Sequence, residues 1–195
     1  MTRLTSILSL SLVLAMAGWQ TQETDRYEII EGSTLWVEGT SSLHDWRCDV
    51  VDMAGTFSID DEEQVTDVVS ASFSVASNLE CKNGTMNRKA HAALGVKDHP
   101  SITFELTSSE VEAGEEGAFT VKAVGLLSIA GETREVTTTV HAMRNESDQL
   151  VLSGFFPVKM SDFNVKPPKA MLGTIKTGDD ITVHFQFISG EASNL

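Results

Sequence analysis

Residues 119–140 read FTVKAVGLLSIAGETREVTTTV, and their apolar residues recur at every second position. The period starts at Phe119, runs to Ile129, and resumes from Val136 to Val140 after a turn-forming segment. Successive side chains of a β-strand point to opposite faces, so this period is typical of half-buried strands. The stretch therefore predicts two antiparallel strands joined by a short hairpin turn.

The same period of two recurs on both sides of this hairpin. Further runs with one apolar face are residues 69–75, 102–106, 150–160 and 181–187. Turn-forming residues separate the runs, at 60–64, 114–117, 145–149 and 178–180. Short connections favour antiparallel pairing of neighbouring strands. With one or two strands before Gly39, the sequence predicts an all-β domain of about eight or nine strands.

Residues 86–94, MNRKAHAAL, have the pattern of a helix, and Gly95 is expected to end it. Arg88 and Lys89 are expected to face outward, and the opposite flank of the helix is apolar. That flank consists of Met86, Ala90, Ala93 and Leu94. It is expected either to cover the mouth of a barrel or to pack as an ordinary amphipathic helix against a sheet.

An antiparallel sheet of this size must close or split into two layers, because an open sheet exposes unpaired edges. A closed barrel of about eight strands leaves room for side chains alone or for one small ligand. The strand pattern fits a barrel and a sandwich alike. The irregular residues 162–173 are expected to form either a portal or lid, or a loop held down by Phe163 and Met171.

The N-terminal residues have the features of a secretory signal peptide. Arg3 supplies a positive charge, and the apolar residues 4–16, LTSILSLSLVLAM, are too few to span a membrane. Residues 15–17, AMA, fit a cleavage site. We expect residues 1–17 to be removed, residues 18–195 to form one domain, and the protein to be periplasmic or secreted. The alternative is a frayed apolar helix at the N-terminus.

The charge balance excludes some classes of partner. The chain has 28 acidic and 14 basic residues, which gives a formal net charge of −14. Such a surface repels nucleic acid and anionic lipid headgroups. No segment after the signal peptide is long and apolar enough to span a membrane. Neither nucleic-acid binding nor stable membrane insertion is therefore expected.

Cys48 and Cys81 are the only cysteines, and an even pair in an exported protein favours a disulfide. If residues 44–60 and 66–79 form a hairpin, its register places the two cysteines opposite each other. Their bond would then contribute about 3–4 kcal/mol to stability. The apolar period also shifts phase near residues 50–52, which predicts a bulge within one long, curving strand.

Residues 41–48, SSLHDWRC, combine a histidine, an aspartate and a cysteine. Adjacent side chains on a strand point apart, so His44 and Asp45 are not expected to form a base–acid pair. No G-x-S-x-G motif is present, and the five histidines show neither H-x-H nor H-x-x-x-H spacing. We predict no catalytic residue, metal or cofactor. Instead, Asp45 is expected to accept backbone N–H bonds and Trp46 to pack across one barrel end.

Four stretches of the chain form a set of motifs in a particular order. Residues 39–46 read GTSSLHDW, 86–106 read MNRKAHAALGVKDHPSITFEL, 127–136 read LSIAGETREV, and 160–187 read MSDFNVKPPKAMLGTIKTGDDITVHFQF. Together they resemble the motifs of the YceI family, the lipocalin-like polyisoprenoid-binding proteins of bacteria. The resemblance runs from about Tyr27 to Ile188, and the cysteines and residues 79–85 depart from it.

The resemblance implies an exported, extended, lipocalin-like eight-stranded antiparallel barrel. Its interior is expected to hold a long-chain isoprenoid lipid or quinone. The resemblance implies no particular oligomeric state. The apolar faces of the strands supply candidate ligand-binding residues: Phe73, Phe104, Val121, Leu127, Val140, Phe156, Phe185 and Phe187. Two alternatives stay open, an enzyme that uses His44 on a small or apolar substrate, and a ligand-free structural or stress-response barrel with a filled interior.

Overall fold

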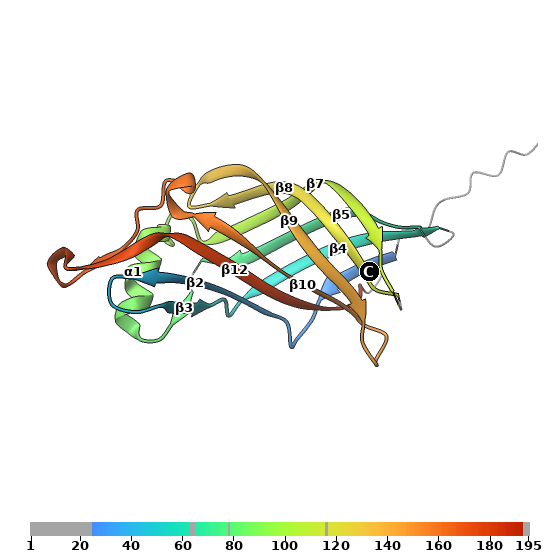
Figure 1. The fold of residues 1–195 in the computed structure, drawn as a ribbon, viewed down its shortest axis with the longest axis horizontal. Helices are drawn as coiled ribbons and strands as arrows, with labels where there is room; N and C mark the ends of the chain where they lie inside the picture. The colour runs from blue at the N-terminus through green and yellow to red at the C-terminus, as the bar shows by residue number, and fades with distance from the viewer. Residues whose placement is uncertain (1–24, 63–64, 78, 116, 193–195) are drawn as a thin grey trace, which may run out of the picture.

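The computed structural model describes residues 25–62, 65–77, 79–115 and 117–192. The predicted signal peptide, residues 1–17, lies outside the described residues. Figure 1 shows an elongated barrel of long strands, with helix α1 (Gly84–Leu94) across its left end.

Eight strands form a closed antiparallel ring. In ring order they are β1 (Asp25–Ile29), β4 (Met53–Glu62), β5 (Val65–Ala76), β7 (Ser101–Ala113), β8 (Phe119–Ile129), β9 (Glu132–Arg144), β10 (Leu150–Lys159) and β12 (Ile175–Glu191). Because β1 pairs with both β4 and β12, the ring closes on itself. The predicted lipocalin-like eight-stranded barrel is confirmed.

Three shorter strands extend the wall at the end that carries α1. Strand β2 (Thr34–Ser41) pairs with β12, β3 (Trp46–Asp49) pairs with β2, and β6 (Glu80–Cys81) pairs with β3. At the α1 end, the wall of the barrel therefore contains β2, β3 and β6 in addition to the eight strands of the closed ring.

The prediction of one long strand with a bulge over residues 44–60 is wrong. The chain forms β3 and β4 as separate strands, divided by residues 50–52. The backbone N–H of Val50 still bonds to β2, whereas the carbonyl of Asp52 already accepts a bond from β5, each at 2.9 Å. The exchange of partner strands within three residues explains the shifted apolar period. The register of β4 against β5 does shift, but later, at Ser58.

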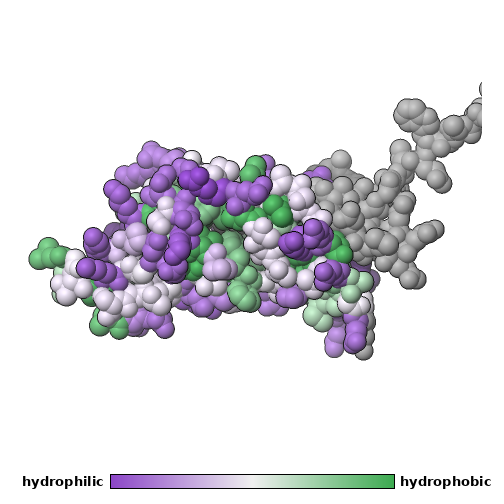
Figure 2. Space-filling model, turned by 45° about the horizontal axis from the view of Figure 1, so that its top comes forward, coloured by the Kyte–Doolittle hydropathy of each residue, from purple (hydrophilic) through white to green (hydrophobic). Residues whose placement is uncertain are grey.

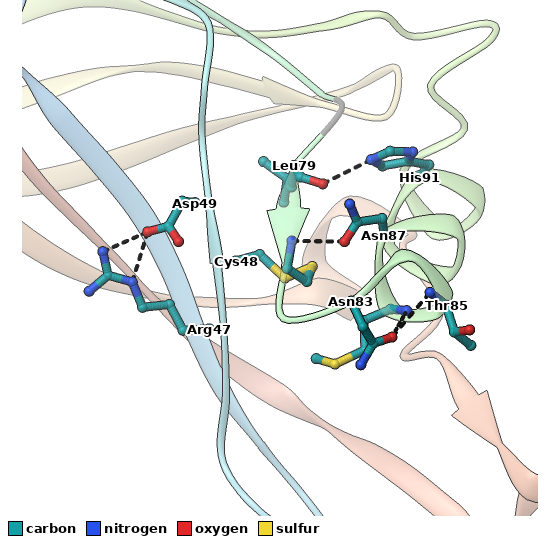
Figure 3. The surroundings of a disulfide bond; sticks show 10 residues. Arg47, Cys48, Asp49, Leu79, Asn83, Thr85, Asn87 and His91 are labelled. Atoms are coloured by element: carbon teal, nitrogen blue, oxygen red, sulfur yellow. Dashed lines mark hydrogen bonds and ion pairs between the residues drawn. A yellow bond between two sulfur atoms is a disulfide. The ribbon is translucent and has the colours of Figure 1, made fainter.

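The predicted disulfide is present. Cys48 and Cys81 are register partners of β3 and β6, and they are bonded across a sequence separation of 33 residues. Cys48 is buried. The bond joins the barrel wall to the short strand that leads into α1, as Figure 3 shows.

Helix α1 starts and ends at well-defined caps. The side chain of Asn83 accepts hydrogen bonds from the backbone N–H groups of Thr85 and Met86 at 3.1 and 3.0 Å. Gly95 takes the left-handed conformation with φ 62°, which ends the helix at the predicted residue. Local sequence signals thus define both ends of the helix.

Two further hydrogen bonds hold α1 against the chain that precedes it. The backbone N–H of Cys81 donates to the side chain of Asn87, and the ring Nε2 of His91 donates to the carbonyl of Leu79, each at 2.9 Å (Figure 3). The helix is consequently fixed to β6, and through the disulfide to β3.

The buried side chains form three clusters. The largest lies where β1 meets β12, at the end away from α1 (Figure 1): Tyr27, Phe57, Ile59, Ala142, Leu150, Leu152, Phe185 and Phe187. The second packs near the α1 end, and consists of Leu127, Val158, Met160, Phe163 and Val165. The third surrounds the disulfide, and consists of Cys48, Val50 and Leu79. The largest group of packed side chains thus lies toward the barrel end away from α1.

Candidate binding cavity

A cavity of about 630 Å³ occupies the barrel interior. Its volume lies within the roughly 300–1,000 Å³ of small-molecule sites. All eight predicted ligand-binding residues line it: Phe73, Phe104, Val121, Leu127, Val140, Phe156, Phe185 and Phe187. The strand periods thus assigned these side chains to the correct face. That they contact a ligand stays a prediction.

Phenylalanine rings line much of the deep part of the cavity. The ring of Phe187 lies 5.3 Å from that of Phe73 and 5.0 Å from that of Phe185, measured between centroids. Phe73 is also 6.3 Å from Phe104. These separations are those of favourable aromatic pairs, so the rings support one another around the cavity.

Several of these rings lie over a glycine of the adjacent strand. A Cβ atom on Gly154 would lie 2.7 Å from Cζ of Phe185 and 2.7 Å from the carbonyl oxygen of Thr139. Gly55 lies against Phe73, and Gly125 against Phe104, even more closely. The apolar period does not single out these glycines, although a glycine inside a strand often marks a close approach of this kind.

Polar side chains of the lining gather at one end of the cavity. They are Ser41, His44, Asn83, Thr85, Lys89, Lys169 and Thr177. These residues lie at the end of β2 and on the β2–β3 loop, around the start of α1, and on β11 and the start of β12, which follow η1 (Met160–Phe163). We call this end the mouth. The cavity therefore combines an apolar interior with a polar mouth, an arrangement suited to a long apolar molecule with one polar end.

Thr138 is a polar exception deep in the lining. Its Oγ1 atom is buried and has no hydrogen-bond partner among the described residues. An unpaired buried hydroxyl costs stability. The Thr138 hydroxyl therefore lowers the stability of the described interior, and its Oγ1 atom is not exposed to the cavity.

The irregular residues 162–173 are held down at their start and border the cavity further along. Phe163 is buried, so it holds the start of the segment down as predicted. The chain then forms β11 (Lys169–Ala170) and the short helix η2 (Met171–Gly173). Met171 is 73% exposed, so the prediction that it also anchors the loop is wrong. Its side chain instead borders the mouth.

Helix α1 presents its predicted apolar flank to the cavity. Met86, Ala90, Ala93 and Leu94 all belong to the lining. Lys89 was predicted to face outward, and this is wrong: it lines the mouth, and its Nζ donates to the carbonyl of Lys169 at 2.5 Å. This bond joins α1 to β11 across the mouth. Arg88 is exposed, as predicted.

The SSLHDWRC stretch forms a structural turn at the mouth. The ring Nδ1 of His44 donates to the backbone carbonyl of Asp45 at 2.7 Å. The indole N–H of Trp46 donates to the carbonyl of Thr40 at 2.9 Å, and the ring lines the cavity, as predicted. The acceptor of backbone N–H bonds in the turn is the hydroxyl of Ser41, which corrects the role predicted for Asp45.

The described residues contain no cluster of three or more metal-ligating side chains. Two shifted pKa values lie away from the cavity, where η1 meets β12. A hydrogen bond from the Ser161 hydroxyl, helped by the Ser161 backbone N–H, lowers the pKa of Asp179. The hydrogen bond and charge of Asp180 raise the pKa of Lys159, with the two groups 2.8 Å apart. The Lys159 and Asp180 side chains are 54% and 80% exposed, so they lie on the outside of the barrel.

Within the described part of the chain, no helix has the length and apolar character needed to cross a membrane. A family model for the YceI-like domain matches residues 30–188. No curated protein matches the chain.

Several solved structures share the fold at low sequence identity. BcnA of Burkholderia cenocepacia is 16% identical, with a TM-score of 0.65, over 81% of this chain and 96% of that one. A polyisoprenoid binding domain from Saccharophagus degradans, implicated in plant cell wall breakdown, is 11% identical, with a TM-score of 0.67, over 87% and 100%. The YCEI protein of Campylobacter jejuni is 14% identical, with a TM-score of 0.54, over 75% and 85%.

Proposed function

The chain belongs to the YceI-like domain family, and on that premise we propose that it is an exported binding protein for a long apolar molecule. The ligand is a polyisoprenoid lipid or an isoprenoid quinone, held in the barrel interior. The protein sequesters or carries this ligand and does not transform it chemically.

The cavity is the observation that carries this proposal. Its deep lining is apolar apart from Thr138, and its polar side chains gather at the mouth. Burial of one isoprene unit contributes on the order of 2–3 kcal/mol. Several units therefore bind without polar contacts, although ordering of the chain offsets part of the gain. The polyisoprenoid-binding description of the Saccharophagus degradans domain agrees with this class of ligand.

The two alternatives from the sequence have less support. A filled structural barrel requires a packed interior, whereas this interior encloses about 630 Å³. An enzyme that uses His44 as a base requires an acidic or polar side chain that orients its ring. Instead, Nδ1 of His44 bonds to a backbone carbonyl in an exposed turn. Loss of turnover in His44→Ala, with the fold intact, would support the enzyme instead.

Export is supported by two independent features. Residues 1–17 have the pattern of a signal peptide, and Cys48 is bonded to Cys81. Structural disulfides persist in oxidising compartments. We place the protein in the periplasm or outside the cell of a bacterium.

The test is mass spectrometry of an organic extract from protein purified in its native exported form without detergent. We expect a stoichiometric isoprenoid. Phe104→Asp, which places a charge in the cavity wall, should abolish retention of the lipid while the protein stays folded.

A matched pair of variants tests the site without adding charge. Ala123→Trp places a ring in the cavity and should lose the ligand, whereas Leu126→Trp, outward on the same strand, should keep it. An empty extract, with no uptake after incubation with quinones, would overturn the proposal.

A further inference from the structure

Three large apolar side chains are exposed at the mouth end of the barrel. Leu43 is 67% exposed, Met171 is 73% exposed, and Leu172 is fully exposed. Leu43 and Met171 also line the cavity, so they border its opening. Figure 2 shows hydrophobic side chains gathered at the tip of this end of the molecule. We call these three residues the apolar tip.

The two segments that carry the apolar tip are bonded to each other. The backbone N–H of Ser42 donates to the carbonyl of Lys176 at 2.9 Å, and the N–H of Lys176 donates to the Ser42 hydroxyl at 3.1 Å. The tip is therefore one feature of the mouth, although Leu43 is far from the others in sequence.

The backbone holds part of the tip in a costly conformation. Met171 and Leu172 have φ values of 48° and 53°, in the left-handed region that non-glycine residues rarely adopt. Gly173 follows with φ 90°. Such strain is usually offset by packing or by function, and burial does not offset it here because both side chains face solvent.

Basic residues gather on the segments that form the mouth. Residues 40–44, 81–97 and 163–177 contain seven of the 14 basic residues of the chain and none of its 28 acidic residues. The seven are Lys82, Arg88, Lys89, Lys97, Lys166, Lys169 and Lys176. The acidic residues that directly adjoin these segments are Asp45, Glu80, Asp98 and Asp162. When these four are counted, three basic residues remain in excess. The net negative charge of the chain predicts repulsion of anionic headgroups. The mouth segments, however, carry a net positive charge, so this end of the molecule can attract them.

We propose that the mouth docks on the surface of an anionic phospholipid bilayer. The apolar tip enters the boundary between headgroups and acyl chains, and the surrounding lysines face the phosphates. A second copy of the chain fits this surface less well, because two basic mouths repel each other. Docking itself does not depend on the cavity. Docking would let an apolar chain pass from the bilayer to the cavity without exposure to water, and this role rests on the proposed function.

Flotation with vesicles tests the docking. The purified full-length mature protein should bind vesicles of mixed phosphatidylglycerol and phosphatidylcholine, bind pure phosphatidylcholine weakly, and lose binding as salt rises. Leu172→Ser should weaken binding, and the combined change of Leu43, Met171 and Leu172 to serine should nearly abolish it. The control is Met143→Ser, which removes an apolar side chain that is 57% exposed on β9.

A second pair of variants isolates the charge. Lys166→Gln with Lys176→Gln should weaken binding to the anionic vesicles by about tenfold or more, since each basic residue near the surface contributes to the attraction. Arg26→Gln with Lys122→Gln, which removes the same charge from other strands, should have little effect. Circular dichroism verifies that every variant is folded.

Three outcomes would overturn the docking proposal. In the first, the protein binds anionic and neutral vesicles equally, or binds neither. In the second, the control variants lose as much vesicle binding as the mouth variants. In the third, the serine variants change their oligomeric state while their vesicle binding is unaltered. The last would make the tip an interface between copies. Ala123→Trp separates the two proposals: it should still dock on vesicles after it has lost the isoprenoid, because its change lies inside the barrel.

Discussion

At the scale of single residues, the width of the cavity depends on which side chains are missing from its wall. Each close pair of a phenylalanine and a glycine places ring atoms in the space that a Cβ atom on the neighbouring strand would otherwise fill. Gly154 and Phe185 are register partners on β10 and β12. The glycine is therefore as important for the cavity as the ring that it accommodates.

Gly154→Ala should reduce the affinity for a long isoprenoid by about tenfold or more while the protein stays folded. The new methyl group would lie 2.7 Å from Phe185 and from the carbonyl oxygen of Thr139, so both the ring and the local backbone of β9 and β10 must shift, which changes the shape of the cavity. Binding can be followed by quenching of tryptophan fluorescence. Gly84→Ala is the control, since its methyl group would come no closer than 3.7 Å to another atom. Equal affinity in both variants would contradict the role of Gly154.

Thr138→Val should raise the stability of the empty protein by about 1–3 kcal/mol, because it removes a buried hydroxyl without a partner. Urea unfolding measures the change. Comparison with Thr137→Val, on the exposed face of β9, corrects for strand propensity. No gain in stability would indicate that the hydroxyl is satisfied.

At the scale of elements, α1 depends on connections rather than on a buried face of its own, since no residue of the helix is fully buried. The disulfide, the Asn87 and His91 side chains, and the bond from Lys89 hold it across the barrel end. Among these, the disulfide is the covalent connection to the barrel wall.

Replacement of both Cys48 and Cys81 by alanine should lower the free energy of unfolding by about 3–4 kcal/mol. The chain-entropy effect of the lost crosslink is the main cause, and urea denaturation measures it. Hydrogen exchange should accelerate more in α1 than in β8, because β8 is held by long strand pairings on both sides. Reduction of the wild-type disulfide should reproduce the loss. Unchanged exchange in α1 would show that the hydrogen bonds alone hold the helix.

The contact between η1 and β12 makes part of the stability dependent on pH. The pKa of Asp179 is lowered by the hydrogen bond from the Ser161 hydroxyl, so this interaction stabilises the folded state when the carboxylate is charged. Its contribution is present above the ordinary carboxyl pKa of about 4 and disappears as the pH falls through the lowered value.

Ser161→Ala should therefore raise the pKa of Asp179 toward its ordinary value and destabilise the protein at neutral pH but not in strong acid. The backbone N–H of residue 161 still bonds to the carboxylate at 2.9 Å, so the shift should be reduced and not abolished. Carbon-detected NMR of the carboxyl group follows the titration. Ser128→Ala, which removes a hydroxyl paired with Thr133, should show no such dependence on pH.

At the scale of the whole molecule, the strand periods predicted the barrel because one face of each strand had to be apolar. The eight residues chosen from those periods line the cavity for the same reason. The division of residues 44–60 into two strands was not predictable, because it depends on which distant strands offer partners on either side of residue 51. The sequence did not predict that Lys89 and Met171 border the mouth. Lys89 is positioned by its bond to the carbonyl of Lys169, and Met171 by a left-handed backbone, and neither leaves a periodic pattern in the sequence.

The cavity links ligand binding to the stability of the whole protein. A ligand that binds the folded barrel and not the unfolded chain stabilises it, by about 4 kcal/mol when its concentration is a thousand times the dissociation constant. Protein stripped of lipid should therefore melt at a lower temperature than reloaded protein, as measured by calorimetry. Ala123→Trp should melt at the same temperature with and without isoprenoid, because its ring occupies the space of the chain, whereas Leu126→Trp should respond like the wild type. If no long isoprenoid changes the melting temperature of the wild-type protein, the cavity has a different ligand.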